Sequence, residues 1–156
     1  MISMDISKLK QFLVNAKKNT YASGGESKAK TLFDGTKEYI FNSGNLKYVD
    51  RYKGHEKFNG EENVFENNKI IWRMKYDGKI LSNKIPADEV YSFLKTSLKK
   101  IPADKPFRGP ERLIDKEFKY INNIKGDMEE FSGEEKIFYG NELIYGLVYN
   151  GKIFNK

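Results

Sequence analysis

Apolar side chains recur with two different periods along this chain, and each period predicts a different kind of element. Residues 5–19 carry apolar side chains at helical spacing with lysines between them, so we expect an amphipathic helix that Asp5 or Ser7 caps. Residues 86–100 show the same pattern, and Pro86 suits the first turn of a helix. The pattern therefore predicts two helices, each with one face for burial.

Alternation with a period of two predicts strands in other segments. Residues 36–41 and 46–52 form a predicted hairpin around a polar turn. Small and polar residues fill 20–30, where we expect a mobile loop. Residues 70–76 place basic side chains on one face, which predicts a half-exposed strand, whereas 143–149 carry no charge and should be covered on both faces.

One stretch of the chain occurs twice, as residues 46–81 and 118–154. Matched residues of the two copies lie a constant number of positions apart, and this number increases by one at a single inserted residue. This agreement predicts an internal repeat, with pseudo-repeat halves at about 5–82 and 86–156 of a single domain spanning 1–156. The matched pairs include Tyr48 with Tyr120, Gly54 with Gly126, Phe58 with Phe131, Gly60 with Gly133, Glu62 with Glu135, Tyr76 with Tyr149 and Gly78 with Gly151.

Each copy predicts a meander of short antiparallel strands. In the first copy these strands are 62–66, 69–76 and 79–81, and the dipeptides between them tolerate the positive φ angles of two-residue turns. The predicted turns are Asn67-Asn68 and Asp77-Gly78, with Gly140-Asn141 and Asn150-Gly151 in the second copy. We therefore expect an α+β fold of two helix-plus-antiparallel-meander halves, whose curved or barrel-like antiparallel sheet packs on two helices.

The composition is that of a folded protein. Of 156 residues, 38% are hydrophobic and 14% are aromatic, which is too many for a disordered chain despite 32% charged residues. The net charge of +6 permits an acidic partner, but the lysines are spread over both predicted helices. The chain has no cysteine, which excludes disulfides and thiolate metal sites. We expect a cytoplasmic protein, because the N-terminus lacks the apolar core of a signal peptide and no apolar run is long enough to span a membrane.

Two Gly-Glu-Glu motifs are the first candidates for a functional site. Their four carboxylates, on Glu61, Glu62, Glu134 and Glu135, could converge on a cation or a basic ligand if the halves pack about a pseudo-twofold axis. Adjacent strand residues point to opposite faces, so only one glutamate of each pair can face a given site. The alternative is structural, with each glutamate paired to a lysine or an arginine.

The proline-rich loop and the aromatic residues supply further candidates. Arg108 lies between two prolines, which suits bidentate binding of an anionic ligand or, structurally, of one of the glutamates. Tyr21 could close over a pocket or simply pack. The strand aromatics form either core or the wall of an apolar small-molecule pocket: Trp72, Tyr76, Tyr145 and Tyr149.

The sequence supplies no recognised catalytic system. His55 is the only histidine, and without cysteine or a second histidine it is a weak metal ligand in a hairpin loop. The chain contains no Gly-x-Ser-x-Gly elbow, no P-loop and no dinucleotide fingerprint. We therefore assign no catalytic residue and expect no metal and no cofactor.

Five motifs follow one another in a specific order. They are Phe12-Leu13-x-x-Ala16-Lys17-x-x-Thr20-Tyr21-Ala22, Phe58-x-Gly60-Glu61-Glu62, Trp72-x-Met74-x-Tyr76-x-Gly78, Pro106-Phe107-Arg108-Gly109-Pro110 and Gly133-Glu134-Glu135. In this order they resemble the bacterial domain of unknown function 5680 family. Members of that family occur alone or fused behind a helix-turn-helix DNA-binding domain of bacterial repressors, so the resemblance implies a sensor or effector module. The one helix predicted at the N-terminus is too short for a helix-turn-helix domain, so we do not expect this chain to bind nucleic acid without a fused DNA-binding domain.

These observations favour a non-enzymatic small-ligand-binding or sensor module with its pocket between the halves. The alternatives are an enzyme that uses paired glutamates, with or without a divalent cation, and an interaction protein with a basic surface. We expect no membrane partner, and the sequence indicates no oligomeric state. The expected ligand-binding residues are Tyr21, Glu62, Trp72, Tyr76, Arg108, Glu135, Tyr145 and Tyr149.

Overall fold

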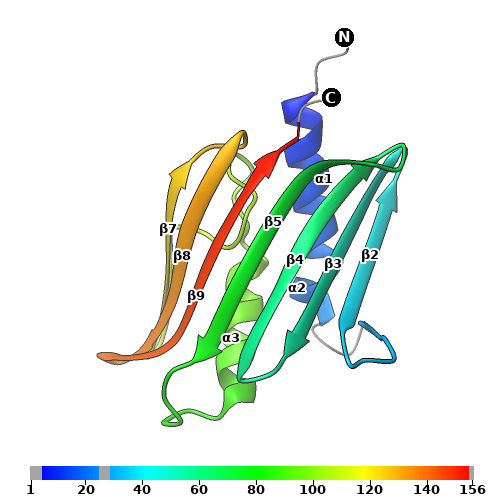
Figure 1. The fold of residues 1–156 in the computed structure, drawn as a ribbon. Coiled ribbons are helices and arrows are strands. Elements are labelled where there is room, and N and C mark those ends of the chain that lie inside the picture. The colour runs from blue at the N-terminus through cyan, green and yellow to red at the C-terminus, as the bar shows by residue number, and fades with distance from the viewer. Residues whose placement is uncertain (1–4, 25–28, 155–156) are drawn as a thin grey trace.

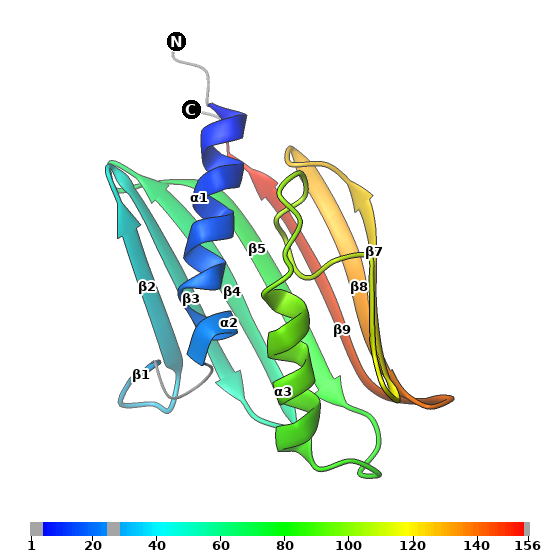
Figure 2. The same ribbon diagram turned by 180° about the vertical axis from the view of Figure 1, so that it is seen from behind.

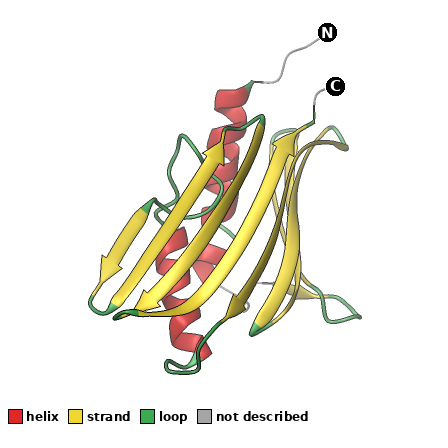
Figure 3. Cartoon of the chain, turned by 60° about the vertical axis from the view of Figure 1, so that its left-hand side comes forward, coloured by secondary structure: helices red, strands yellow, loops and turns green. Residues whose placement is uncertain are grey.

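The chain forms one antiparallel sheet with helices against one of its faces (Figures 1 and 2). The computed structural model describes residues 5–24 and 29–154. Its nine strands lie in the order β1-β2-β3-β4-β5-β9-β8-β7-β6. Figure 3 shows that the sheet is twisted and curved but open, with β1 and β6 at its two edges. The α+β class and the antiparallel sheet are confirmed, and the barrel-like alternative is wrong.

The element boundaries follow the predicted pattern with some differences. The helices are α1 (Ile6–Lys18), α2 (Tyr21–Gly24) and α3 (Ala87–Leu98). No helix in the described part of the chain is both long and apolar enough to cross a membrane. The strands are β1 (Lys30–Thr31), β2 (Lys37–Ser43), β3 (Leu46–Gly54), β4 (Lys57–Glu66), β5 (Lys69–Ile80), β6 (Arg112–Asp115), β7 (Phe118–Gly126), β8 (Glu130–Tyr139) and β9 (Glu142–Ile153).

The two longer helices form where their apolar spacing predicts them. The Asp5 side chain caps α1 by accepting a hydrogen bond from the backbone N–H of Lys8 at 3.0 Å, and Pro86 is the residue before the first turn of α3. Both helices lie on the same face of the sheet (Figure 2), and their apolar faces belong to the main core cluster. The buried apolar residues of these helices are Leu9, Phe12, Leu13, Ala16, Val90, Phe93 and Leu94.

The mobile loop predicted at 20–30 is wrong in its first part, because Tyr21–Gly24 forms the short helix α2. Aromatic packing orders this segment: the Tyr21 ring lies 6.3 Å from the ring of Tyr39 and 6.3 Å from that of Tyr52, edge-on to both. The many small and polar residues of this segment predict a loop, but in the structure the packing of the Tyr21 ring determines the conformation of the segment. Residues 25–28 of the predicted loop lie outside the described residues.

Two of the four predicted turns are wrong, because β5 and β9 run straight through them. Asn67 and Asn68 have φ angles of 51° and 69°, and Gly140 has a φ of 61°, so the first turn of each meander forms as predicted. Gly78 and Gly151 instead lie inside long strands. A Cβ atom at Gly78 would lie 2.6 Å from Cζ of Phe58, and one at Gly151 would lie 2.5 Å from Cζ of Phe131. These glycines make room for aromatic rings, not for turns.

The helices cover only one face of β9, so the expectation that residues 143–149 are covered on both faces is wrong. Tyr145, Leu147 and Tyr149 are buried beneath the helices, while Val148 points outward and is 55% exposed. A single exposed valine costs a folded protein little, so an uncharged strand does not require a second covering layer.

Corresponding residues of the two sequence copies hold corresponding places in the sheet. Asp50 pairs with Glu62 across β3 and β4, and Asn122 pairs with Glu135 across β7 and β8. Both copies shift register at the same point, between Val64 and Phe65 in the first copy and between Ile137 and Phe138 in the second. The copies meet at the centre of the sheet, where Tyr76 of β5 pairs with Tyr149 of β9.

Candidate ligand-binding site

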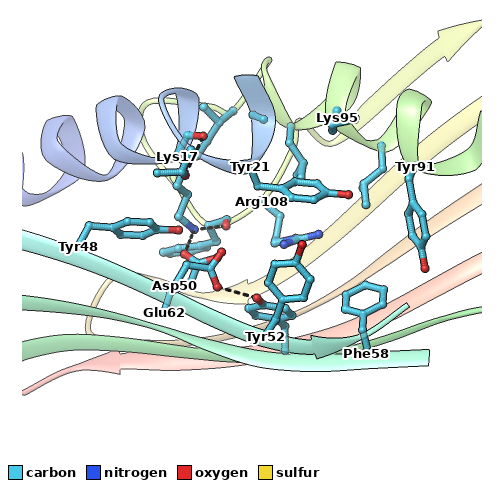
Figure 4. Close-up of a pocket in the computed structure, with 18 of the residues that line it drawn as sticks. Lys17, Tyr21, Tyr48, Asp50, Tyr52, Phe58, Glu62, Tyr91, Lys95 and Arg108 are labelled. Atoms are coloured by element: carbon cyan, nitrogen blue, oxygen red, sulfur yellow. Dashed lines mark hydrogen bonds and ion pairs between the residues drawn. The ribbon is translucent and has the colours of Figure 1, made fainter. Parts of the chain in front are cut away.

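A cavity of about 360 Å³ lies between the helices and the first-half strands (Figure 4). Side chains of α1, α2 and α3 line it from one side, and side chains of β3, β4 and β5 line it from the other. The loop before β6 adds Phe107 and Arg108. A cavity of this volume suits a small organic molecule.

Strand alternation places a polar cluster on the floor of this cavity. Tyr48, Asp50 and Tyr52 occupy every second position of β3, so all three face the helices. Asp50 lies directly opposite Glu62 in the β3–β4 register, and the two residues are only 5% and 3% exposed. Two carboxyl groups thus meet on the buried face of neighbouring strands.

Lys17 reaches this cluster from the C-terminal end of α1. Its Nζ atom lies 2.9 Å from Oε1 of Glu62 and donates a hydrogen bond to the carbonyl oxygen of Phe107. The same ammonium group lies 5.3 Å from the centre of the Trp72 ring. Burial lowers the pKa of Lys17, and the neighbouring Glu62 carboxylate opposes this shift. Lys17 and Glu62 therefore form a buried ion pair.

Asp50 has no such cation of its own. Its Oδ1 atom accepts a hydrogen bond from the Tyr76 hydroxyl at 2.6 Å. Burial, and next the repulsion of Glu62, raise the pKa of Asp50 to about 8, although the hydrogen bond from Tyr76 opposes the shift. Burial and the adjacent carboxyl groups also raise the pKa values of Tyr48 and Tyr76, so both phenols stay protonated at neutral pH.

Arg108 is fixed by the second half of the molecule. Its Nε donates to Oε2 of Glu135 at 3.0 Å and its Nη2 donates to Oε1 at 2.8 Å, a bidentate pair. The hydroxyl groups of Tyr120 and Tyr145 donate to the same carboxylate. Burial acts to lower the pKa of Arg108, but Glu135 outweighs it and the pKa is raised. The guanidinium is therefore charged, and Nη1 has no hydrogen bond within the described residues.

Aromatic and aliphatic side chains surround the rest of the cavity. The Phe58 ring lies 6.0 Å from that of Tyr91, edge-on, and the Tyr91 hydroxyl donates to the backbone carbonyl of His55. Leu94, Leu98 and Ile101 also line the cavity. The cavity thus combines an apolar chamber with a charged floor, and Figure 4 shows Phe58 and Tyr91 at the end away from Asp50 and Glu62.

The residues predicted for the site divide into two groups. Four of them line the cavity: Tyr21, Glu62, Tyr76 and Arg108. The other four are buried in the sheet behind it and do not line it: Trp72, Glu135, Tyr145 and Tyr149. Two residues of the second group support one residue of the first. Tyr145 donates a hydrogen bond to Glu135, and Glu135 binds Arg108.

Sequence reasoning missed two charged residues of the floor. Lys17 lies four residues after Leu13 and eight after Leu9, so its helical spacing places it on the apolar face of α1, a signal that sequence reasoning did not use. Asp50 also carried a signal, because it interrupts the tyrosines of the inward-facing positions Tyr48 and Tyr52. A charged residue at the centre of an inward-facing aromatic row is a candidate site residue.

The Gly-Glu-Glu motifs do not build a carboxylate cluster. Glu62 and Glu135 face inward, each bound to its own cation, while Glu61 is half-buried and Glu134 is exposed. Over residues 5–24 and 29–154, no three histidine, aspartate or glutamate side chains come together in a metal-binding arrangement.

Comparison with known proteins extends the resemblance noted in the sequence. The model of the family called domain of unknown function (DUF5680) matches residues 50–154, a range that holds Asp50, Glu62, Tyr76 and Arg108. The matched range begins after α1 and α2, which supply Lys17 and Tyr21. Searches of curated proteins and of solved structures found no match. The match covers more than half of the chain, and the protein belongs to the DUF5680 family.

Proposed function

We propose that this domain is a non-enzymatic module that binds a small amphipathic molecule in the cavity between its helices and sheet. The observation that carries this proposal is the cavity itself, which has a volume of about 360 Å³, a mainly apolar lining and ionisable side chains at its floor. A chamber of this kind buries the apolar body of a ligand, and a few polar groups fix its orientation.

The charge of the floor supports a ligand role over a purely structural one. Burying charged groups costs free energy, and well-packed apolar residues often stabilise a fold as much as a buried ion pair does. Two buried ion pairs and a further carboxyl group lie in or beside the cavity. Folding alone does not require these buried charged groups, since their burial costs free energy. Recognition of a polar group on a ligand does require them.

A regulatory role follows from the same site. Ligand bound against α1, α2 and α3 contacts elements that precede and follow the first group of strands. Ligand binding would stabilise the packing of these helices on the sheet, and a fused or associated partner could detect that change. We propose a sensor role in this sense.

The two halves are proposed to descend from one duplicated module of a helix and antiparallel strands. Matching register pairs, such as Gly60 with Tyr76 and Gly133 with Tyr149, support this origin. In each half a cation neutralises the inward-facing glutamate, but from a different element: Lys17 of α1 pairs with Glu62, and Arg108 of the loop before β6 pairs with Glu135.

Dye binding tests the cavity directly. N-phenyl-1-naphthylamine is uncharged at neutral pH and fluoresces when it enters an apolar site. We expect saturable enhancement of its emission with the wild-type protein and a strong loss with Leu98→Trp, because Leu98 lines the cavity and is half-buried. Thr96→Trp is the matched control, since Thr96 is exposed on the same helix and does not line the cavity. Equal dye binding by both variants, or no saturable binding by the wild type, contradicts the proposed function.

A further inference from the structure

We propose that the cavity selects ligands that carry a cationic amine on an apolar body, and that Asp50 is the residue that binds the amine. This inference rests on the proposed ligand-binding function and names its ligand class. Three observations support it: the pairing of charges on the cavity floor, the contrast between Asp50 and Asn122 at equivalent sheet positions, and the aromatic lining of the cavity.

Among residues 5–24 and 29–154, buried carboxyl groups outnumber buried cations in and beside the cavity floor. Three buried carboxyl groups, on Asp50, Glu62 and Glu135, lie with two buried cations, Lys17 and Arg108. Lys17 pairs with Glu62 at 2.9 Å, and Arg108 pairs with Glu135 at 2.8 Å. Within the described residues, the Tyr76 hydroxyl is the hydrogen-bond donor to Asp50, and Asp50 forms no ion pair. A protonated Asp50 leaves the set neutral, whereas an ionised Asp50 requires a further cation, which a ligand would supply.

The equivalent position in the second half shows what a closed version of this site looks like. Asn122 pairs with Glu135 as Asp50 pairs with Glu62, and it accepts a hydrogen bond from Tyr149 at 2.7 Å as Asp50 does from Tyr76. The Asn122 amide also donates to the carbonyl of Gly109 at 3.0 Å, so the loop before β6 seals the second-half position.

The first-half position differs from that sealed version in two respects. Asp50 lines the cavity, whereas Asn122 is bonded to the loop before β6. Asp50 is also ionisable, whereas Asn122 is neutral. The neutral residue thus occurs where backbone fills the space, and the acidic residue occurs where a ligand could enter. A carboxyl group at an open, buried position suits a donor ligand with a positive charge.

The lining of the chamber also suits a cation. Tyr21, Tyr52, Phe58, Tyr76 and Tyr91 all line it. Ring faces attract ammonium groups, and the attraction grows when water is excluded. An anionic ligand would have to compete with Glu62 for Lys17, and at Arg108 only Nη1 is open to it, because Nε and Nη2 are bound to Glu135. Lys95 and Asp88, both on α3, offer opposite charges at the lining and favour neither sign.

Amine binding should release a proton at neutral pH. Burial, and next the repulsion of Glu62 on β4, raise the pKa of Asp50 to about 8, against the opposing effects of Tyr76 on β5, Arg108 in the loop and Lys17 on α1. The empty site therefore holds a protonated Asp50 at pH 7, and an ammonium group beside it favours the carboxylate. The released proton is a readout that a merely structural aspartate would not give.

Three probes with one body and different head groups test the inference: 4-phenylbutylamine, 4-phenylbutan-1-ol and 4-phenylbutanoate. Calorimetry on the full chain should show that the amine binds at least about tenfold more tightly than the alcohol, as a charge-assisted hydrogen bond would provide. Titration at pH 7 in buffers of different ionisation enthalpy should show proton release with the amine alone.

Asp50→Asn is the informative variant, because Asn122 already occupies the equivalent position in the folded second half. The advantage of the amine over the alcohol should disappear, with alcohol binding unchanged. Asp88→Asn, a like change at an exposed lining residue, should keep the advantage.

The outcomes separate the inference from the proposed function. If the alcohol or the butanoate binds as tightly as the amine, or if Asp50→Asn keeps the advantage, amine selection is overturned while a binding cavity stands. If none of the three probes binds and the naphthylamine dye also fails, both proposals fall.

Discussion

Arg108 and Asp50 are both buried polar residues, yet the surrounding structure treats them differently. The Arg108 guanidinium has a full bidentate partner in Glu135, which two tyrosine hydroxyls also contact. Asp50 has one tyrosine hydroxyl and a neighbouring carboxyl group. At the residue scale, therefore, we expect Arg108 to contribute mainly to stability, whereas the protonation of Asp50 is sensitive to its surroundings.

Arg108→Ala should strongly destabilise the protein. The change leaves the fully buried Glu135 without its cation, a loss of about 3–5 kcal/mol in the free energy of unfolding. Urea unfolding measures it. Lys84→Ala is the control, because the Lys84 side chain is 53% exposed, its partner Glu142 is 44% exposed, and their pair should contribute less than about 1 kcal/mol. Similar small losses in both variants would show that the Arg108 pair does not stabilise the fold despite its burial.

Asp50 should make stability depend on pH in an unusual direction. An exposed aspartate titrates at about pH 3.9, whereas the pKa of folded Asp50 is about 8. Between these values the folded state holds a proton that the unfolded chain has lost, so the free energy of unfolding falls as pH rises. Relative to Asp50→Asn, the wild type should lose stability from about pH 5 to about pH 8 in urea unfolding. Asp88→Asn should leave the slope unchanged, and a slope that Asp50→Asn also leaves unchanged would mean that Asp50 is ionised at neutral pH.

The strands show where sequence patterns inform and where they mislead. Alternation and the Asn67-Asn68 and Gly140-Asn141 dipeptides correctly predict the hairpins, because those residues must adopt left-handed backbone conformations. Asp77-Gly78 has the same chemistry as a turn, but the sheet uses Gly78 to admit the ring of Phe58. Local chemistry does not reveal which neighbour approaches a glycine from another strand, so this error could not be avoided from the sequence.

Gly78→Ala should destabilise β5, although alanine ordinarily improves on glycine in a strand. Its Cβ would lie 2.6 Å from Cζ of Phe58 and 3.0 Å from Cδ1 of Leu147, and such overpacking costs about 1–3 kcal/mol. Thermal or urea unfolding measures the loss, which Phe58→Leu in the same chain should partly relieve. Gly146→Ala is the control, because the nearest atom to its Cβ is Cδ1 of Leu81 at 3.4 Å. A neutral Gly78→Ala would show that the Phe58 ring moves freely.

The whole molecule assembles its site from parts that are distant in sequence. The two-helix pattern and the repeated strands were sufficient to predict the α+β class, the antiparallel sheet and four residues of the cavity lining. The sequence predicts a pocket between the halves, but the cavity's place between the helices and β3–β5 could not be predicted, because it depends on where α1 ends over β3 and β4 and on how the loop with Arg108 docks against Glu135. Long-range packing decides both, and neither leaves a periodic signal in the chain.

Trp72 gives this assembly an optical consequence. It is the chain's one tryptophan, fully buried, and its ring lies 5.3 Å from the Lys17 ammonium that neutralises Glu62. Indole emission responds to nearby charge, so the protein carries an intrinsic, label-free reporter beside the ions at the floor of its cavity. Any molecule or proton that rearranges the ions above that ring will change the colour or brightness of the light the protein emits.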